Sequence, residues 1–173
     1  MTALGREEQT GLEFGGLVRE HQSMVFSLSY HFLHDREAAE EVAQEVFLAL
    51  HRHLGEIKSP EHALFWLRKV AAQRSIDAAR QRTRRPQVAL EEVAEPAARA
   101  AAQDPLLRDL LRRLVATLPE TPRMVMVMRY QEDLDPAEIA AVLDMPIATV
   151  KSHLQRSLAL LREKLERRGV GGY

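Results

Sequence analysis

The chain of 173 residues contains no cysteine, which excludes disulfide bonds, thiol nucleophiles and zinc sites built on thiolates. Aromatic residues make up only 5% of the chain, and no apolar run approaches the length that spans a membrane. Neither sign of charge is in excess, because 24 Lys and Arg are matched by 25 Asp and Glu. A basic signature for nucleic acid is therefore absent from the chain as a whole, so any such signal must be local.

The residues that are abundant favour helix. Alanine, leucine, glutamate and arginine dominate, and no alternating run of β-branched residues predicts a strand. We therefore predict an all-α fold, with enough length for one medium domain or two small ones. The first ten residues do not form a secretory signal, and we expect a soluble, cytoplasmic protein with no membrane insertion.

Residues 134–165 predict two helices joined by a tight turn. Asp135 is placed to cap the first helix, Pro136 suits its first position, and Glu138 can complete the cap. Pro146 prevents the first helix from continuing. This pattern is typical of a helix-turn-helix, whose second helix inserts its N-terminal end into the major groove of DNA.

The second helix of this pair is expected to bury an apolar stripe, because its apolar residues recur at steps of three and four. The stripe consists of Ile147, Val150, Leu154, Leu158, Leu161 and Leu165. The polar residues left off it near the N-terminal end are Thr149, Lys151, Ser152, Gln155 and Arg156. Gln and Arg can read base edges, whereas Lys, Ser and Thr suit phosphates. An ordinary helical hairpin with a solvated face would show the same pattern.

In the N-terminal half, Asp35 is placed to cap a helix with an acidic side. Residues 35–45 contain five acids and one base. The helix is expected to bury Val42, Val46 and Leu50. Its other side carries Glu41, Gln44, Glu45 and Leu48. Taken alone, this charge run fits a solvated helix surface equally well.

A longer helix is predicted to begin at Ser59 and Pro60, again an N-cap residue followed by proline. Its first half holds Phe65 and Trp66, and its second half is basic, with seven bases and one acid between positions 68 and 85. The bases are Arg68, Lys69, Arg74, Arg80, Arg82, Arg84 and Arg85. Basic residues beside aromatics suit a nucleic-acid backbone and unstacked bases, although both aromatics could equally belong to the core.

Residues 86–103 contain two prolines, three glutamates and an alanine run, and we predict that they form a flexible linker. They divide the chain into an N-terminal helical bundle at 12–85 and a C-terminal helix-turn-helix domain at 104–168. Helix is expected to restart at Asp104 and Pro105. The buried face of that helix is predicted to consist of Leu106, Leu107, Leu110, Leu111, Leu114 and Leu118.

Two segments taken together resemble a known family. The first reads AEEVAQEVFLALHRHL and is followed by FWLRKVAAQRSIDAARQR. The second reads LPETPRMVMVMRYQEDLDPAEIAAVLDMPIATVKSHLQRSLALLREKL. In this order, across a linker of this length, they resemble the two domains of a bacterial RNA polymerase sigma factor of the extracytoplasmic-function (ECF) group. The resemblance covers nearly the whole chain from Leu17 to Leu165.

The resemblance implies a function and the residues that perform it. The protein would bind core RNA polymerase and direct promoter recognition and DNA melting. By position, the surface for the polymerase clamp helices corresponds to Glu41, Gln44, Glu45 and Leu48. The element that captures the minus-ten region corresponds to Lys58, Trp66, Lys69, Gln73, Arg74 and Arg80. The reader of the minus-thirty-five element corresponds to Thr149, Lys151, Ser152, Gln155 and Arg156. The family also implies a separate anti-sigma protein as a regulator.

This chain departs from the family pattern at three places. Ala72 and Gln73 stand where the family usually has Arg-Asn, His153 stands where an Arg is frequent, and Leu158 replaces a further basic residue. Two other readings stay open. The first is a conventional helix-turn-helix regulator that binds an operator as a dimer. The second is a sigma-like decoy that binds an anti-sigma protein but not DNA.

An enzyme or a metalloprotein is not predicted. His31 and His34 lie three residues apart on an expected helix, but no third ligand follows at a sensible spacing. The chain has no HExxH motif and no glycine-rich phosphate loop. In the family the polymerase carries the catalysis, so we expect no catalytic residue, no metal and no cofactor.

Overall fold

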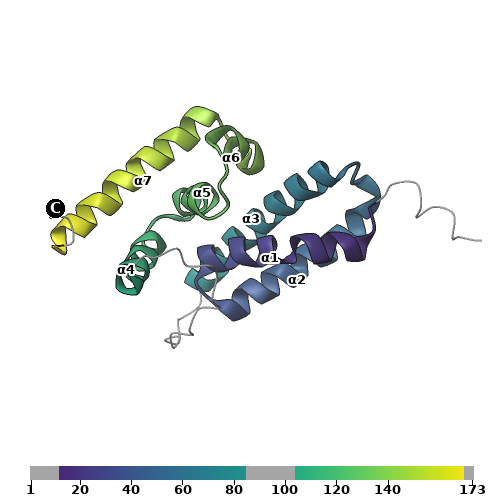
Figure 1. The fold of residues 1–173 in the computed structure, drawn as a ribbon, viewed down its shortest axis with the longest axis horizontal. Coiled ribbons are helices and arrows are strands. Elements are labelled where there is room, and N and C mark those ends of the chain that lie inside the picture. Colours follow the sequence, from purple (N-terminus) through teal and green to yellow (C-terminus); the bar gives the residue numbers. More distant parts are fainter. Residues whose placement is uncertain (1–11, 85–103, 170–173) are drawn as a thin grey trace, which may run out of the picture.

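The computed structural model describes residues 12–84 and 104–169, and every regular element within these two ranges is helical. In chain order the elements are α1 (Phe14–Leu33), α2 (Arg36–His53), the short 3₁₀ helix η2 (Leu54–Glu56), α3 (Pro60–Arg84), α4 (Pro105–Ala116), α5 (Glu120–Tyr130), α6 (Pro136–Leu143) and α7 (Ile147–Arg167). The predicted all-α fold is confirmed. Figure 1 shows two helical units, α1 to α3 and α4 to α7, which we call the N-terminal and C-terminal units. The predicted linker lies outside the described residues.

The N-terminal unit is a bundle of three helices that meet around an apolar core (Figure 1). The side chains that fill it without exposure include Val25, Leu28, Phe32, Val46, Leu50 and Leu67. One polar pair lies among them: the hydroxyl of Ser75 on α3 donates to that of Ser29 on α1 at 3.1 Å, and Ser29 donates to the carbonyl of Val25 at 3.0 Å. Because both hydroxyls are satisfied, the buried polar pair is tolerated and joins α1 to α3.

The predicted helix starts of the N-terminal unit are confirmed by their side-chain caps. The carboxylate of Asp35 accepts a hydrogen bond from the backbone N–H of Ala38 at 3.0 Å, and Ser59 accepts one from His62 at 3.0 Å. The turn between α1 and α2 passes through His34, which adopts a left-handed conformation with φ of 52°. Each cap satisfies a backbone donor that would otherwise have no partner.

The C-terminal unit places the predicted helix-turn-helix in α6 and α7. Asp135 and Glu138 form the expected capping box, with both hydrogen bonds at 2.8 Å. The turn then passes through Asp144 in a left-handed conformation, and α7 begins after Pro146. Helix α5 supports the pair from below with a run of buried residues from Met124 to Met128. Helix α5, which contacts α4, α6 and α7, therefore forms the centre of this unit.

On two helices, α7 and α4, the structure buries other residues than the predicted apolar faces contain. On α7 the buried positions are Val150, Ser157 and Leu161, whereas Ile147 is 42% exposed and Leu158 is 41% exposed. The prediction followed apolar residues alone, but the seam toward α5 passes through position 157, and position 158 lies to one side of it. On α4, Leu106 is 80% exposed, because the first turn of this helix lies beyond the core that Leu114 and Leu118 enter.

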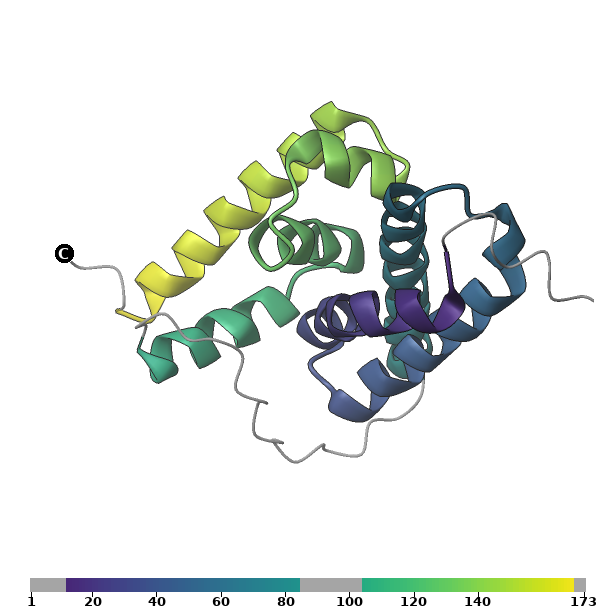
Figure 2. The same ribbon diagram turned by 45° about the vertical axis from the view of Figure 1, so that its right-hand side comes forward.

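The two units contact each other, which the sequence did not predict. Helix α5 packs against α1 and α3, and α6 packs against α3 (Figure 2). One continuous cluster of buried residues includes Leu28 and Phe32 of the N-terminal unit together with Met124, Met128 and Ile139 of the C-terminal unit. The apolar core of the molecule therefore runs across the boundary between the units.

Candidate nucleic-acid and protein-binding surfaces

The N-terminal end of α7 presents the polar residues that the sequence singled out. Thr149, Lys151, Gln155 and Arg156 are exposed, and Ser152 is half-buried. No acidic residue lies in the first turn of the helix. Two bases, an amide and two hydroxyls can together contact base edges and phosphates. The N-terminal end of α7 is therefore accessible to a ligand of the size of a DNA groove.

The packing of α6 against α7 fixes this end in place. Val150 on α7 and Ile139 on α6 are fully buried against each other's helices, in the same cluster. The turn between them is closed by a hydrogen bond from the Met145 N–H to the Ala140 carbonyl at 3.1 Å. A rigid support of this kind holds the polar side chains at the N-terminal end of α7 in a defined position.

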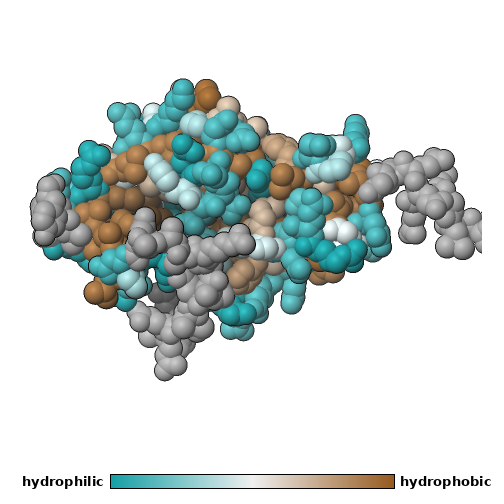
Figure 3. Space-filling view, viewed as in Figure 1, coloured by the Kyte–Doolittle hydropathy of each residue, from teal (hydrophilic) through white to brown (hydrophobic). Residues whose placement is uncertain are grey.

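The two residues of α7 that depart from the family pattern, His153 and Leu158, differ in their surroundings. His153, the seventh residue of α7, is half-buried. Leu158 lines a cavity of about 480 Å³ between α1, α4, α5 and α7. Figure 3 shows hydrophobic surface between α4 and α7, where the cavity lies. Leu158 therefore takes part in the packing around this cavity, and its apolar character fits that place.

Helix α3 arranges the predicted minus-ten residues on two different faces. Trp66, Lys69, Gln73 and Arg80 follow at steps of three, four and seven residues and so form one stripe. Gln73 and Arg80 are exposed, whereas Trp66 and Lys69 are half-buried. Arg74 lies on another face, where its guanidinium donates to the Glu45 carboxylate of α2 at 3.4 Å.

The remaining parts of this surface lie at the start of α3. Lys58 is exposed in the loop that precedes the helix, and Phe65 is 38% exposed. The ring of Trp66 lies 5.8 Å from that of His53, centroid to centroid. Ala72 is fully buried, so a side chain at this position faces the core of the bundle. The departure from the family pattern at Ala72 therefore affects the packing of the bundle, whereas the departure at Gln73 changes an exposed side chain.

The acidic side of α2 is exposed, as its pattern indicated. Glu41, Gln44, Glu45 and Leu48 all face solvent, and Leu48 is 58% exposed. An open groove of about 830 Å³ lies beside them, between α1 and α2. Its apolar lining is provided by Phe14, Val18, Phe26, Phe47 and Leu48, with Gln44 at its edge. The sequence did not predict this groove, because it forms only where α1 lies against α2.

Basic side chains gather at the cavity between the units. His31 and His34 of α1 and its cap lie there together with Arg108 and Arg112 of α4. Burial, followed by the charges of Arg112, Arg123 and His31, lowers the pKa of His34 to about 4. His34 is therefore neutral at pH 7. Within the described ranges, neither of its ring nitrogens has a hydrogen-bond partner.

The described residues provide neither a metal site nor a membrane-spanning helix. In residues 12–84 and 104–169, no three His, Asp or Glu side chains come together in a way that could hold a metal ion. The helices in the same ranges include none that is long and apolar enough to cross a membrane.

Comparison with known proteins identifies two matching family models. The model of sigma-70 region 2 matches residues 17–85, and that of sigma-70 region 4 matches residues 108–161. The RNA polymerase sigma-H factor of Pseudomonas aeruginosa is 27% identical, over 88% of this chain and 86% of that protein. The ECF RNA polymerase sigma factor SigW of Bacillus subtilis is 26% identical, over 88% of each.

The fold also resembles that of a solved structure. The sigma factor RpoE in complex with the anti-sigma factor NepR, from Bartonella quintana, matches with a TM-score of 0.71. The match covers 88% of this chain and 96% of that one, at 17% sequence identity. At this identity the likeness concerns the arrangement of the helices.

Proposed function

This chain belongs to the ECF group of the sigma-70 family of RNA polymerase sigma factors, and we propose that it binds core RNA polymerase and brings it to promoters through two separate DNA contacts. The observation that carries the proposal is the order of the two family models, region 2 at 17–85 and region 4 at 108–161. A conventional operator-binding regulator needs only the second of these. We propose the domains 12–85 and 104–168, joined by 86–103, as the corresponding functional units.

We propose that the polymerase docks on α2 through Glu41, Gln44, Glu45 and Leu48. Exposure of all four supports this, as does the apolar groove beside them. Protein interfaces commonly combine an apolar centre with a polar rim, and here Leu48 belongs to both the groove and the acidic side. An acidic rim would favour a partner with basic residues at the matching positions.

For the minus-ten element, the proposed surface is the stripe on α3 with Lys58 at its start. Base pairs cannot be read on their Watson–Crick edges inside a duplex, so an opened strand must be bound by stacking and charge. Phe65 and Trp66 provide aromatic rings at one end of the stripe, and Lys69, Gln73 and Arg80 provide polar groups along it. Arg74 can contribute from the neighbouring face when Glu45 releases it.

The minus-thirty-five element is assigned to the N-terminal end of α7. Thr149, Lys151, Ser152, Gln155 and Arg156 offer the mixture of base-reading and phosphate-binding groups that a recognition helix needs. Two weak DNA contacts on one chain raise each other's effective concentration, so neither has to be strong. The polymerase would carry out the chemistry, and we propose no catalytic residue, metal or cofactor for this chain.

Regulation by an anti-sigma protein and a place in the cytoplasm are part of the same proposal. The solved structure that this fold resembles is a sigma factor in complex with an anti-sigma factor. A protein that works with polymerase on chromosomal DNA must reside where both are found. A decoy that binds an anti-sigma protein without DNA is the remaining competitor, and transcription distinguishes the two.

Run-off transcription with purified core polymerase and a library of promoters tests the proposal. We expect transcripts that depend on this protein and that share two upstream sequence elements. Binding to duplex operator DNA without polymerase, together with no transcripts from core polymerase, would favour the conventional regulator. Failure to bind core polymerase at all would contradict the proposed function.

A further inference from the structure

We propose that the cavity between α1, α4, α5 and α7 binds a small carboxylate with an apolar tail, of the kind that a medium-chain fatty acid provides. The cavity measures about 480 Å³, which lies within the range of roughly 300 to 1,000 Å³ that ligand pockets occupy. This inference goes beyond the proposed function and does not rest on it, since none of the residues proposed for polymerase or DNA lines the cavity.

The charged groups that line the cavity are all basic. Arg108 and Arg112 come from α4, His31 and His34 come from α1 and its cap, and no described residue of the lining is an acid. Each arginine has five N–H donors, so it can bind a ligand in addition to a partner within the protein. A carboxylate has two oxygens, which match the parallel N–H groups of one guanidinium. The lining therefore favours an anionic head group.

His34 provides a buried polar group that a carboxylate could satisfy. Both of its ring nitrogens are shielded from solvent, and neither is hydrogen-bonded to another residue of the described ranges. Buried polar atoms without a partner are rare in folded proteins, because leaving one unpaired costs free energy. A neutral imidazole always has one N–H, which can donate to a carboxylate oxygen. A carboxylate in the cavity would therefore remove part of this cost.

The environment of His34 is electrostatically positive. Burial is the largest cause that lowers the pKa of His34 to about 4, and the charges of Arg112, Arg123 and His31 lower it further. Arg123 does not line the cavity, but its charge acts on the imidazole all the same. An anion bound among these groups would be attracted by each of them, in a place that is partly shielded from water.

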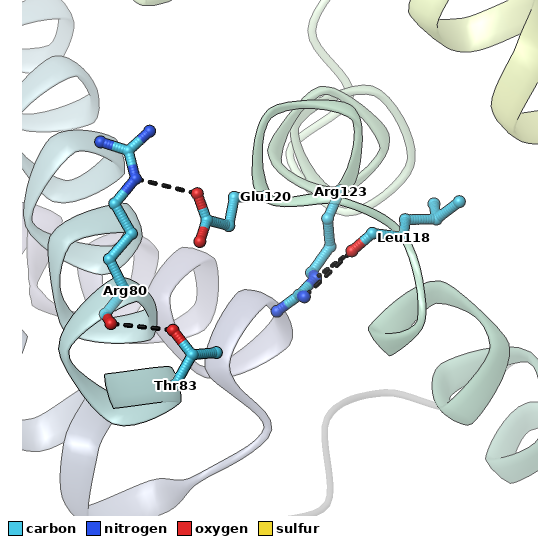
Figure 4. Close-up of polar contacts among 5 residues, drawn as sticks. All are labelled: Arg80, Thr83, Leu118, Glu120 and Arg123. Carbon is cyan, nitrogen blue, oxygen red and sulfur yellow. Dashed lines mark hydrogen bonds and ion pairs between the residues drawn. The ribbon is translucent and has the colours of Figure 1, made fainter. Parts of the chain in front are cut away.

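The contacts of Arg123 leave the proposed place of the carboxylate open. Its guanidinium donates to the carbonyl of Leu118 at 3.0 Å, as Figure 4 shows, and to the carbonyl of Phe32 at 3.5 Å. The acid that acts on Arg123 is Glu120, whose carboxylate accepts a hydrogen bond from Arg80 of α3 at 2.9 Å (Figure 4). Glu120 does not line the cavity, so it does not take the place proposed for the ligand.

The rest of the lining fits an apolar tail. Leu158 is 41% exposed, so water contacts this apolar wall, and a tail that covers it would be favoured by the hydrophobic effect. A basic residue at this position, as in the family pattern, would place a charge against the tail. The departure at Leu158 therefore suits the proposed ligand. The apolar lining consists of Leu111, Val115, Met126, Val127, Leu158 and Leu161.

The groove between α1 and α2 does not suit the same ligand, although it is also apolar. Among the described residues that line this groove, the only charged one is Glu40. An anion would be repelled there, whereas the cavity lined by Arg108 and Arg112 would attract it. The two sites are therefore expected to differ in the charge of what they bind, and the groove serves as an internal control.

Isothermal titration calorimetry of the full chain with octanoate tests the site. Octanol has the same tail without the charge, and acetate has the charge without the tail. We expect octanoate to bind with a dissociation constant of roughly 0.1 mM, and the other two compounds to bind about tenfold more weakly or not at all. No binding of octanoate, or equal binding of octanoate and octanol, would overturn the proposal.

Two matched pairs of variants locate the ligand. Arg112→Gln removes a charge from the cavity, and Arg113→Gln removes the same charge from an exposed neighbour outside the lining. Leu158→Gln and Leu160→Gln form the second pair, since these side chains are 41% and 44% exposed and only Leu158 lines the cavity. We expect the first variant of each pair to weaken octanoate binding about tenfold and the second to change it less than about twofold. Equal losses within each pair would overturn the proposal.

The histidine Cε1–H signals in NMR spectra of the unmodified chain provide an independent readout. Octanoate should shift the signals of His31 and His34, which line the cavity, and leave that of His51 in place. The His51 ring lies 5.1 Å from the ring of Phe14, which lines the groove between α1 and α2. A shift of His51 alone would place the ligand in that groove and overturn the proposal. Since no measurement involves polymerase or promoter DNA, failure here is distinguishable from failure of the proposed function.

Discussion

His34 shows how one residue can couple the packing of the units to pH. It caps α1 in a left-handed conformation and lies in the cavity toward α4 and α5. The groups that face it are Arg108 and Arg112 of α4, Arg123 and Tyr130 of α5 and His31 of α1. The side chains that α7 brings to the cavity, Leu158 and Leu161, carry no charge. A neutral imidazole is therefore strongly favoured in the folded protein.

The first prediction follows from the lowered pKa of His34. An unfolded histidine binds a proton near pH 6.5, whereas the folded chain resists protonation of His34 until about pH 4. Stability from this residue is present above pH 6.5 and is lost as the pH falls from 6.5 to 4. We expect a loss of roughly 1 to 3 kcal/mol in the free energy of unfolding over this range, measured by urea titration. In His34→Gln this part of the pH dependence should vanish, and an unchanged pH profile would contradict it.

A second prediction at the residue scale concerns base reading. Arg156 is exposed at the proposed reading end of α7, and Arg162 is exposed nearly two turns further along the same helix. Arg156→Ala should weaken binding to the minus-thirty-five element by roughly 1 to 3 kcal/mol and relax its sequence preference. Arg162→Ala removes the same charge and is the control. If both variants weaken binding equally for all sequences, Arg156 contacts phosphates only.

The third prediction concerns a whole secondary-structure element, helix α2. One side of this helix is buried through Val42, Val46 and Leu50, so charge reversal on the other side should leave the fold intact. Glu41→Lys combined with Glu45→Lys should abolish association with core polymerase, measured by size-exclusion chromatography or biolayer interferometry. Reversal of Glu45 also removes the partner of Arg74, so circular dichroism must accompany the binding assay.

The matched control for α2 is Glu37→Lys, on an exposed acid in the first turn of the same helix. This variant changes the charge of α2 without touching the groove or the four proposed residues. We expect near-normal association. Normal association of the Glu41 and Glu45 double variant would show that the polymerase docks elsewhere.

At the scale of the elements, the sequence predicted where helices begin more accurately than which faces they bury. The caps at Asp35, Ser59 and Asp135 were all predicted, because a cap depends on residues within one turn of each other. The faces of α4 and α7 were predicted less well. Whether Leu106 or Leu158 is buried depends on where a neighbouring helix ends, and local periodicity carries no information about that.

At the scale of the whole molecule, the fourth prediction concerns the apolar core that both units share. Trp66, the single tryptophan, lies in the N-terminal unit, so its fluorescence reports on that unit alone. Met128 is fully buried in the C-terminal unit. Because both units share one core, Met128→Ala should lower the urea midpoint reported by Trp66, with a cost of roughly 2 to 5 kcal/mol in the free energy of unfolding.

Circular dichroism provides the comparison for this experiment. Coincident transitions by fluorescence and by helicity indicate one cooperative unit. A Trp66 transition that does not move, together with a second helical transition that does, would show that the two units unfold independently. The shared core would then contribute little to the stability of the N-terminal unit.

Local sequence pattern predicted some features of the candidate surfaces and missed others. The polar end of α7 and the acidic side of α2 were predicted, since both consist of residues on one helix at regular spacing. The contact of Arg74 was not, because its partner is Glu45, which is 29 positions away. The groove beside Leu48 was also missed, since it is formed only when α1 lies against α2.

The helical class, the helix starts and the turn before α7 could be predicted from the chain alone, because they depend on backbone dihedral preferences and hydrogen bonds between near neighbours. The family was indicated by the residue pattern of two segments in their order along the chain. Three features could be seen only in the folded chain: the two units share a core, Glu120 binds Arg80, and Arg123 contacts Phe32. Arg123 and Phe32 are 91 positions apart. Contacts of that separation arise when apolar faces are buried against each other, and their geometry is set by the shape of all the faces together.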